Sequence, residues 1–330
     1  MPIPVTGIFL DTSASQQFLG DADFQTVSYE NADRAVIANL ATGTSYKLLK
    51  IMPFGDSITY GVVSSTNDTE GGGYRKILWD SLSSRSVTID FTGSLSNGPS
   101  GFDADHDGHR GWTLNQLNDA DANLIGPVLP DALLVMAGTN DSRDDSVSTM
   151  LQDLRALLVS ITENAPHAVV FVASVPPIRV GQQSQARADR VDAYNDGMPA
   201  VIDELRGLGR SIVFVDMRSL TVDDIAAPSV DSGLHPSAAG YAKIAALWES
   251  ALEQHFGLDA TGIGPERDSF SNIANLIGSS WGDRLTGNSG DNLLIGGAGN
   301  DTLVGGTGND RFLFAAGDGQ DVISDFAPGS

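Results

Sequence analysis

The chain of 330 residues contains no cysteine, so disulfide bonds, thiolate metal ligands and cysteine nucleophiles are excluded. Positive charge is also scarce, because 19 Lys and Arg stand against 42 Asp and Glu and give a formal net charge of −23. Such a charge repels nucleic acids and anionic membranes, and we expect no nucleic-acid partner. No run of about 18 apolar residues occurs, and no basic segment opens the chain, so we expect neither a membrane span nor a cleavable signal peptide.

Apolar residues nevertheless make up 41% of the chain, and its length exceeds what one hydrophobic core usually serves. Between residues 47 and 257, apolar runs typical of buried strands alternate with segments of helical period. The runs are YKLLKIMPF, SVTIDFTG, DALLVMAG, HAVVFVASV and SIVFVDM. Apolar residues from Met150 to Ile161 recur at helical spacing between the third and fourth runs. The pattern predicts an α/β domain of three αβα layers around a five-stranded parallel sheet.

The first run ends in GDSIT, where Gly55 permits a tight bend before Asp56 and Ser57. Ligands of open parallel sheets bind beyond the carboxyl ends of the strands. Ser57 would stand at such an end, with backbone N–H groups nearby to stabilise developing negative charge. The alternative is that Asp56 and Ser57 only cap the next helix.

GDSIT and three later stretches resemble the ordered sequence blocks of the SGNH, or GDSL, hydrolases. DFTGSLSNG supplies Gly93, AGTND supplies Gly138 and Asn140, and DSGLHPS supplies His235. The resemblance implies that Ser57 is the nucleophile and His235 its general base. It also implies an oxyanion hole formed by the N–H groups of Ser57 and Gly93 and by the side-chain amide of Asn140. The alternatives are a turn residue for Asn140, a strand end for Gly93 and an exposed helix start for His235.

The family usually places an aspartate three residues before the histidine, and here that position is Ser232. Asp231 lies one residue earlier, while Asp223 and Asp224 lie further back. Three interpretations remain open. The loop is rearranged so that Asp231 reaches His235, a backbone carbonyl orients the imidazole, or the enzyme works as a Ser–His dyad.

The stretches 71–82 and 91–113 resemble carbohydrate esterase family three, the acetyl xylan esterase branch of these hydrolases. The resemblance implies a serine esterase that removes O-acetyl groups from polysaccharide, needs no cofactor for catalysis, and has Arg75 and Trp112 as substrate-side or structural contacts. For Trp112 the alternative is packing under the loop. A metal site in DADHDGH is a further alternative to simple solvation, through Asp103, Asp105, His106 and His109.

From residue 278 the chain repeats every nine residues, as GSSWGDRLT, GNSGDNLLI, GGAGNDTLV and GGTGNDRFL. This resembles the RTX nonapeptide, which implies a parallel β-roll that binds calcium between its turns through aspartates and backbone carbonyls. The sixth positions, the expected metal ligands, are Asp283, Asn292, Asp301 and Asp310. The eighth positions, the expected core, are Leu285, Leu294, Leu303 and Phe312. Two repeats would make one coil, and the first two depart from the consensus at Trp281 and Asn292. The alternative is a disordered acidic tail.

The chain therefore divides into a strand segment at 1–46, a hydrolase domain at 47–257, a linker at 258–277 and an RTX roll at 278–330. We expect the N-terminal strands to pack on the roll, although an independent hairpin is an open alternative. RTX proteins generally leave the cell through type I secretion machinery, which implies a secreted, extracellular protein without an N-terminal signal. The final DVISDFAPGS is short for the complete C-terminal secretion signal.

We therefore expect a secreted esterase acting on short acyl groups, with acetylated carbohydrate as its substrate. No long apolar lid accompanies the blocks, which disfavours a lipase of long chains. Two alternatives are a GDSL lipase, lysophospholipase or thioesterase with the same catalytic residues, and a non-catalytic, calcium-dependent surface or adhesion protein.

Overall fold

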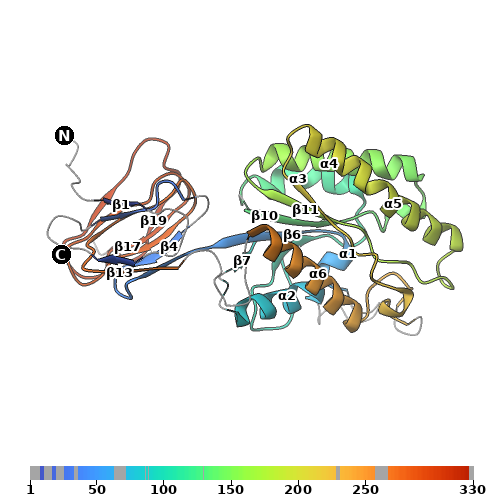
Figure 1. Cartoon of the computed structure of the whole chain (residues 1–330), viewed down its shortest axis with the longest axis horizontal. Coiled ribbons are helices and arrows are strands. Elements are labelled where there is room, and N and C mark those ends of the chain that lie inside the picture. The colour runs from blue at the N-terminus through green and yellow to red at the C-terminus, as the bar shows by residue number, and fades with distance from the viewer. Residues whose placement is uncertain are drawn as a thin grey trace. The chain divides into compact units, whose positions relative to one another are not determined.

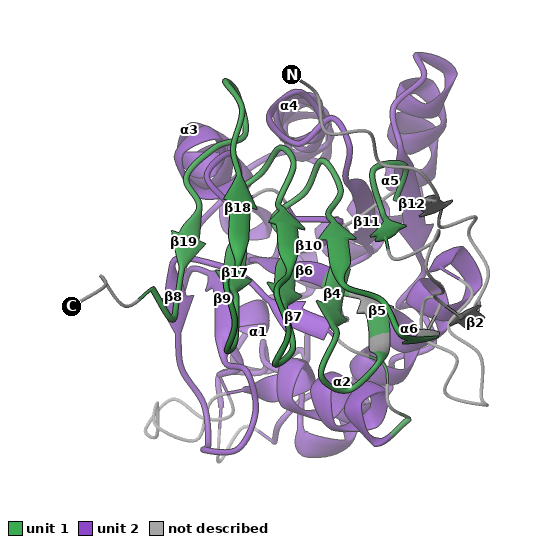
Figure 2. Cartoon of the chain, turned by 90° about the vertical axis from the view of Figure 1, so that its left-hand side faces the viewer, with its two compact units in different colours: residues 1–49, 85–88, 257–330 green, residues 50–84, 89–256 purple. Residues whose placement is uncertain are grey.

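The computed structural model describes residues 8–10, 17–19, 26–32, 36–62, 72–85, 87, 89–128, 130–227, 231–256 and 267–326. The chain forms two compact units (Figures 1 and 2). Unit 1 comprises Met1–Leu49, Arg85–Thr88 and Gly257–Ser330, and unit 2 comprises Lys50–Ser84 and Ile89–Phe256. No helix within these described ranges is both long enough and apolar enough to cross a membrane.

Unit 2 is built on a sheet that has seven strands among the described residues. Its spatial order is β12 (Ile212–Val215), β11 (Val169–Ala173), β10 (Ala132–Met136), β6 (Leu49–Gly55), β9 (Asp105–Gly108) and β8 (Leu95–Ser96), with β7 (Ile89–Phe91) also paired to β6. β12, β11, β10, β6 and β9 are parallel, and β8 pairs antiparallel with β9. All five expected runs form strands. β8 and β9 were not expected, because their residues LS and DHDG carry no apolar pattern.

Helices cover both faces of this sheet, so the unit has the expected three layers (Figure 1). α2 (Gly73–Ser84) and α6 (Ala238–Phe256) lie together on one face. α3 (Leu114–Ile125), α4 (Val147–Asn164) and α5 (Gln185–Gly207) lie on the other. α4 is the helix expected from Met150 to Ile161, and its buried side chains recur on one stripe. Every residue of β10 is buried, as expected of a central strand covered on both faces.

Unit 1 contains two sheets whose strands come from both ends of the chain. One sheet has the order β1 (Ile8–Leu10), β3 (Thr26–Ser28), β14 (Asn275–Ile277), β16 (Leu293–Ile295) and β18 (Arg311–Leu313). The other has the order β19 (Val322–Ile323), β17 (Thr302–Val304), β15 (Arg284–Thr286), β4 (Val36–Asn39), β5 (Thr44–Lys47), β13 (Arg267–Ser271) and β2 (Gln17–Leu19).

Successive nonapeptides alternate between the two sheets, so two repeats complete one coil. Leu285 lies beside Leu303 in one sheet, and Leu294 lies beside Phe312 in the other. Leu285, Leu294 and Leu303 are fully buried and Phe312 packs against them, so the eighth positions line the core. These parallel strands form the expected β-roll.

The N-terminal strands continue the two sheets of the roll. β3 pairs in parallel with β14, and β4 pairs in parallel with β15. Val27, Tyr29, Val36 and Ala38 are buried in the same core as the repeat leucines. One hydrophobic core therefore joins segments separated by more than 200 residues of the chain.

The expectation of a linker at 258–277 is wrong for the part that the structure describes. Residues 267–277 contain β13 and β14, while 258–266 lie outside the described residues. Phe270, Ile273 and Leu276 are buried in the core of unit 1. Turn-forming residues dominate this stretch, and they obscured the three apolar side chains that anchor it.

Candidate active site

The end of β6 and the short helix α1 (Ser57–Tyr60) place Ser57 at the carboxyl edge of the sheet. A Cβ at Gly55 would lie 2.2 Å from the carbonyl oxygen of Met136, so only glycine fits there. Asp56 is the N-cap, and its Oδ1 accepts a hydrogen bond of 2.8 Å from the N–H of Ile58. The capping alternative thus describes Asp56, whereas Ser57 is the first residue of the helix. Burial raises the pKa of Asp56 to about 6.

Three side chains form a hydrogen-bonded chain next to this helix. His235 Nε2 lies 2.8 Å from Ser57 Oγ, and His235 Nδ1 lies 2.9 Å from Asp231 Oδ1. An ionised carboxylate only accepts hydrogen bonds, so Nδ1 carries the ring proton and Nε2 is left to accept from the serine hydroxyl. The two groups that the sequence separates by 178 positions are in contact.

The loop from Asp231 to His235 wraps around the carboxylate. Asp231 Oδ2 accepts hydrogen bonds of 3.0 Å from the backbone N–H groups of Gly233, Leu234 and His235. Burial acts to raise the pKa of Asp231, but the ring of His235 and these N–H groups hold it well below its usual range. The carboxylate therefore stays ionised. Asp224 lies elsewhere, where it pairs with Lys243 at 2.8 Å.

A cavity of about 400 Å³ opens beside Ser57 and His235. Its other lining residues are Val62, Arg110, Gly111, Asn140 and Leu234. The sequence predicted only Asn140 of these five, although Arg110 and Gly111 lie within the expected substrate-side stretch 91–113. No sequence motif indicated Val62 or Leu234 as site residues.

Asn140 and Gly93, the two other oxyanion-hole candidates, have different surroundings. Asn140 follows β10, and its side-chain Nδ2 donates a hydrogen bond of 2.8 Å to the carbonyl of Trp112. Gly93 follows β7, where a Cβ would lie 2.1 Å from the backbone of His106. In the described part of the chain Gly93 is not among the residues that line the cavity.

A substrate-side role for Arg75 is wrong, because its side chain is fully buried. The guanidinium donates five hydrogen bonds, to the carbonyls of Thr59, Tyr60, Asn97 and Ala104 and to the Asn97 side chain. Burial lowers the pKa of Arg75 to about 10, so it remains charged at neutral pH. Arg75 is thus a structural brace between α2, α1 and the stretch 91–113.

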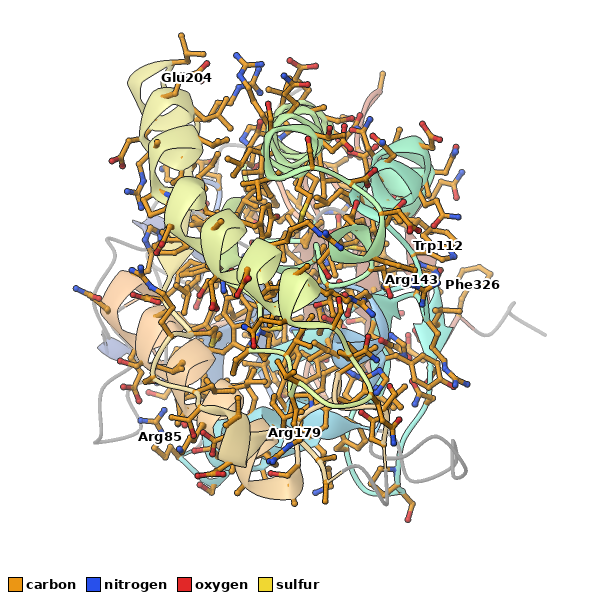
Figure 3. All side chains as sticks on the ribbon, turned by 90° about the vertical axis from the view of Figure 1, so that its right-hand side faces the viewer. Arg85, Trp112, Arg143, Arg179, Glu204 and Phe326 are labelled. Carbon is orange, nitrogen blue, oxygen red and sulfur yellow. The ribbon has the colours of Figure 1, made fainter. Side chains whose placement is uncertain are left out.

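Trp112 lies half-buried at the surface of unit 2 (Figure 3). Its ring stacks on His109 at a centroid distance of 3.9 Å and an interplanar angle of 12°. Nε2 of His109 in turn lies 3.3 Å from the buried Asp107. One face of the Trp112 ring is therefore covered by packing within the loop.

Three of the four candidate metal ligands of the stretch 103–109, Asp103, His106 and His109, contact other protein groups. Asp103 accepts from the N–H of Phe91, and His106 contacts Asn97 and accepts from the N–H of Gly108. Burial lowers the pKa of His106 to about 3, so its ring is neutral. Elsewhere in the described residues, the carboxylates of Asp141, Asp145 and Asp153 lie within 4.8 Å of one another and could hold a cation.

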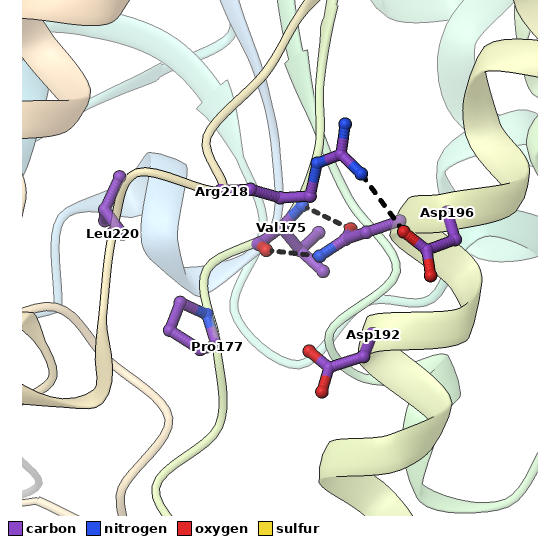
Figure 4. A pocket seen from close by; sticks show the side chains of 7 residues that line it. Val175, Pro177, Asp192, Asp196, Arg218 and Leu220 are labelled. Carbon is purple, nitrogen blue, oxygen red and sulfur yellow. Dashed lines mark hydrogen bonds and ion pairs between the residues drawn. The ribbon is translucent and has the colours of Figure 1, made fainter.

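A second cavity, of about 330 Å³, lies beyond the carboxyl ends of β11 and β12 (Figure 4). Asn195 closes one side by pairing its amide with both the N–H and the carbonyl of Val175 at 2.9 Å. Arg218 and Asp196, which also line the cavity, form a salt bridge of 3.0 Å. No serine or histidine of the described chain lines this cavity, so it lacks the Ser–His pair of the first cavity.

In unit 1, the sixth-position side chains of the repeats point into the turns. Asp283, Asn292 and Asp301 are buried, and Asp310 is half-buried. Buried carboxylates between successive turns are the chemistry that calcium prefers.

Comparisons with known proteins match both units. The GDSL-like Lipase/Acylhydrolase family matches residues 54–243, and the RTX calcium-binding nonapeptide repeat matches residues 277–312 in four copies. A multidomain esterase of Ruminococcus flavefaciens is 28% identical over 244 residues, which are 66% of this chain and 30% of that protein. The chain thus aligns with less than a third of the length of that relative.

Two solved structures resemble unit 2. The family 3 carbohydrate esterase of Clostridium thermocellum is 30% identical with a TM-score of 0.54, and the match covers 63% of this chain and 97% of that one. A family 3 carbohydrate esterase of Talaromyces cellulolyticus is 24% identical with a TM-score of 0.53 and the same two coverages. The latter similarity concerns the fold alone.

Proposed function

The chain belongs to the GDSL-like lipase/acylhydrolase family, and we propose that it is a serine esterase that removes acetyl groups from carbohydrate. The observation that carries the proposal is the hydrogen-bonded chain from Ser57 through His235 to Asp231. A serine hydroxyl is a weak nucleophile until an adjacent base takes its proton. His235 supplies that base, and Asp231 supplies the negative charge that stabilises the protonated ring.

In the proposed reaction, Ser57 Oγ attacks the ester carbonyl while His235 Nε2 takes the hydroxyl proton. The tetrahedral intermediate collapses as His235 returns that proton to the departing sugar oxygen, which leaves an acetyl group on Ser57. Water, deprotonated by His235, then attacks the acetyl carbonyl, and His235 returns the proton to Ser57 Oγ as the Oγ–C bond breaks and acetate leaves. Throughout, the ionised Asp231 stabilises the imidazolium and keeps the ring in the required tautomer.

The oxyanion would accept hydrogen bonds from the N–H of Ser57, the amide of Asn140 and the N–H of Gly93. Asn140 is supported by its place in the cavity wall, where the carbonyl of Trp112 fixes its amide. Each such donor contributes about 3 to 4 kcal/mol to transition-state stabilisation. Gly93 rests on the family resemblance, since it is absent from the described cavity lining.

The choice of a short acyl group is supported by the size of the cavity, and the choice of a sugar ester by the names of the relatives. Val62 and Leu234 are the two aliphatic side chains among its described lining residues, fewer than a long acyl chain would contact. The matched structures are carbohydrate esterases, which favours a sugar as the alcohol part of the ester. The RTX repeats add bound calcium in unit 1 and support type I secretion to the extracellular space.

The test compares acetyl, butyryl and decanoyl esters of 4-nitrophenol and acetate release from acetylated xylan. The parent should hydrolyse the acetyl ester fastest and release acetate from xylan. Ser57→Ala should lose the activity, whereas Ser250→Ala, a change at an exposed serine on α6, should keep it. A preference for decanoyl esters or lysolipid would favour the lipase alternative, and full activity of Ser57→Ala would refute the mechanism.

A further inference from the structure

The four RTX repeats share one close contact inside each turn. The side chain at the sixth position lies over the glycine at the first position. A Cβ on Gly278, Gly287, Gly296 or Gly305 would lie 2.4, 2.4, 2.0 or 2.6 Å from an oxygen of the sixth-position residue. The repeats therefore present the same geometry, and what differs is which groups satisfy the sixth side chain.

In the first repeat, protein donors occupy both oxygens of Asp283. Oδ1 accepts from the backbone N–H of Val36 at 2.6 Å and from the hydroxyl of Ser279 at 2.9 Å. Oδ2 accepts from the backbone N–H of Ser279 at 2.6 Å. Val36 belongs to the N-terminal strand β4, and Ser279 stands where the repeat consensus has its second glycine.

The second repeat is also satisfied by the protein. Asn292 Oδ1 accepts from the N–H of Asn288 at 2.8 Å. Its Nδ2 donates to the Ala274 carbonyl at 2.9 Å and to Asn288 Oδ1 at 3.2 Å. Asn288, like Ser279, replaces the second consensus glycine, and the neutral amide of Asn292 brings no charge to attract a cation.

In the third repeat the second position is Gly297, which has no side chain to donate. Asp301 Oδ1 accepts from the N–H of Asp283 at 2.7 Å, but Oδ2 is buried without a hydrogen-bond partner among the described residues. The residue is only 1% exposed. A buried polar atom left unpaired destabilises the folded state, and more strongly when it is charged.

The surroundings of Asp301 add to this cost. Oδ2 is enclosed by protein, and the carboxylates of Asp283 and Asp321 lie close enough to repel that of Asp301. A divalent cation bound to the unpaired oxygen would offset both the desolvation and the repulsion. The residues of the third turn thus fit calcium, and those of the first turn do not.

Val36 of β4 gives Asp283 the same backbone N–H contact that Asp283 gives Asp301, so Ser279 is what distinguishes the first turn. We infer that Ser279 takes the place of calcium at the first turn, which β4 closes, so that the cation sites of the roll begin at Asp301. The N-terminal segment then acts as a metal-free cap, and calcium governs only the later turns. This departs from the expectation that all four sixth positions bind metal.

Calcium titration of the full-length chain by isothermal calorimetry tests the assignment with a matched pair of variants. Asp301→Asn should bind at least one ion fewer than the parent, whereas Asp283→Asn, the same change two repeats earlier, should bind the same number. Loss of an ion in Asp283→Asn, or an unchanged number in Asp301→Asn, would overturn the assignment.

Hydrogen exchange of the unmodified protein tests it without any substitution. In chelator, the amides of β4 and β15 should already be protected, and calcium should change their protection by less than about twofold. Calcium should raise the protection of β17 and β19 by about tenfold or more. An equal gain in amide protection at β4 and β17 would show that the first turn also needs calcium to fold, and this would refute the inference.

Discussion

Replacing Asp231 with asparagine should disable the active site while leaving the fold intact. The carboxylate faces the ring N–H of His235 with one oxygen and three backbone N–H groups with the other. An asparagine in the same position has one acceptor and one donor group. Because three N–H donors at 3.0 Å favour the oxygen on their side, the NH₂ group must face His235.

That orientation reverses the tautomer of the imidazole. Nδ1 would have to accept from the amide, so the ring proton would move to Nε2, which faces Ser57 Oγ at 2.8 Å. A protonated Nε2 cannot take the serine proton. In a serine protease with this arrangement the corresponding substitution lowers kcat by about 10⁴, and we expect a loss of 10³- to 10⁴-fold here, or about 4 to 5 kcal/mol.

Initial rates on 4-nitrophenyl acetate measure the effect, and KM should change by less than about threefold because the cavity wall is untouched. Asp223→Asn provides a control, since Asp223 is an exposed aspartate eight residues earlier in the chain. Both variants should melt within a few degrees of the parent. A loss in Asp231→Asn below about tenfold would remove this carboxylate from the mechanism.

Three further predictions concern other residues of unit 2. Arg75→Met should lower the unfolding free energy of the unit by about 3 to 5 kcal/mol, because it leaves several buried carbonyls without donors, whereas the neighbouring Lys76→Met should cost under about 1 kcal/mol in a denaturant titration. Asn140→Ala should lower kcat by about 10²- to 10³-fold with little change in KM, and an effect on KM alone would argue against an oxyanion contact. Burial raises the pKa of Asp141 to about 6 in the folded protein, above its value in the unfolded chain, so the stability that this group contributes below pH 4 is lost as the pH rises to about 6. Asp141→Asn should remove about 2 to 3 kcal/mol of that pH dependence, and an unchanged profile in melts between pH 4 and 7 would contradict the assignment.

The sequence identified the features that depend on local pattern. Five apolar runs indicated the strands, and the nonapeptide period indicated which leucines are buried in the roll. The signature blocks singled out Ser57 and His235, which the fold brings to 2.8 Å from each other. The predictions of the strands and of the buried leucines were confirmed because strand burial and the repeat period can be recognised from neighbouring residues.

The features that the sequence left open or misassigned depend on the conformation of a loop or on partners distant in the chain. Asp231 contacts His235 because the loop directs three backbone N–H groups onto one of its oxygens. The sequence shows only that the aspartate stands one position before its usual place in the motif, and this does not reveal the loop conformation. The family resemblance left Arg75 as a substrate-side or a structural contact, and its acceptors, which come from residues 59 to 104, make it structural. β9 escaped notice because the polar side chains His106 and Asp107 are buried there, against the usual alternation of a half-exposed strand.

β5 and β13 of unit 1 pair antiparallel, with Tyr46 opposite Arg267. All of unit 2 lies in the chain between these two strands, at the point where a hairpin loop would otherwise join them. A connection of a few turn-forming residues between Lys47 and Arg267 would close the same ladder. The connection between β5 and β13 is on this basis an insertion site. Another domain whose two termini lie close together could replace unit 2 there without changing the strand register of the roll.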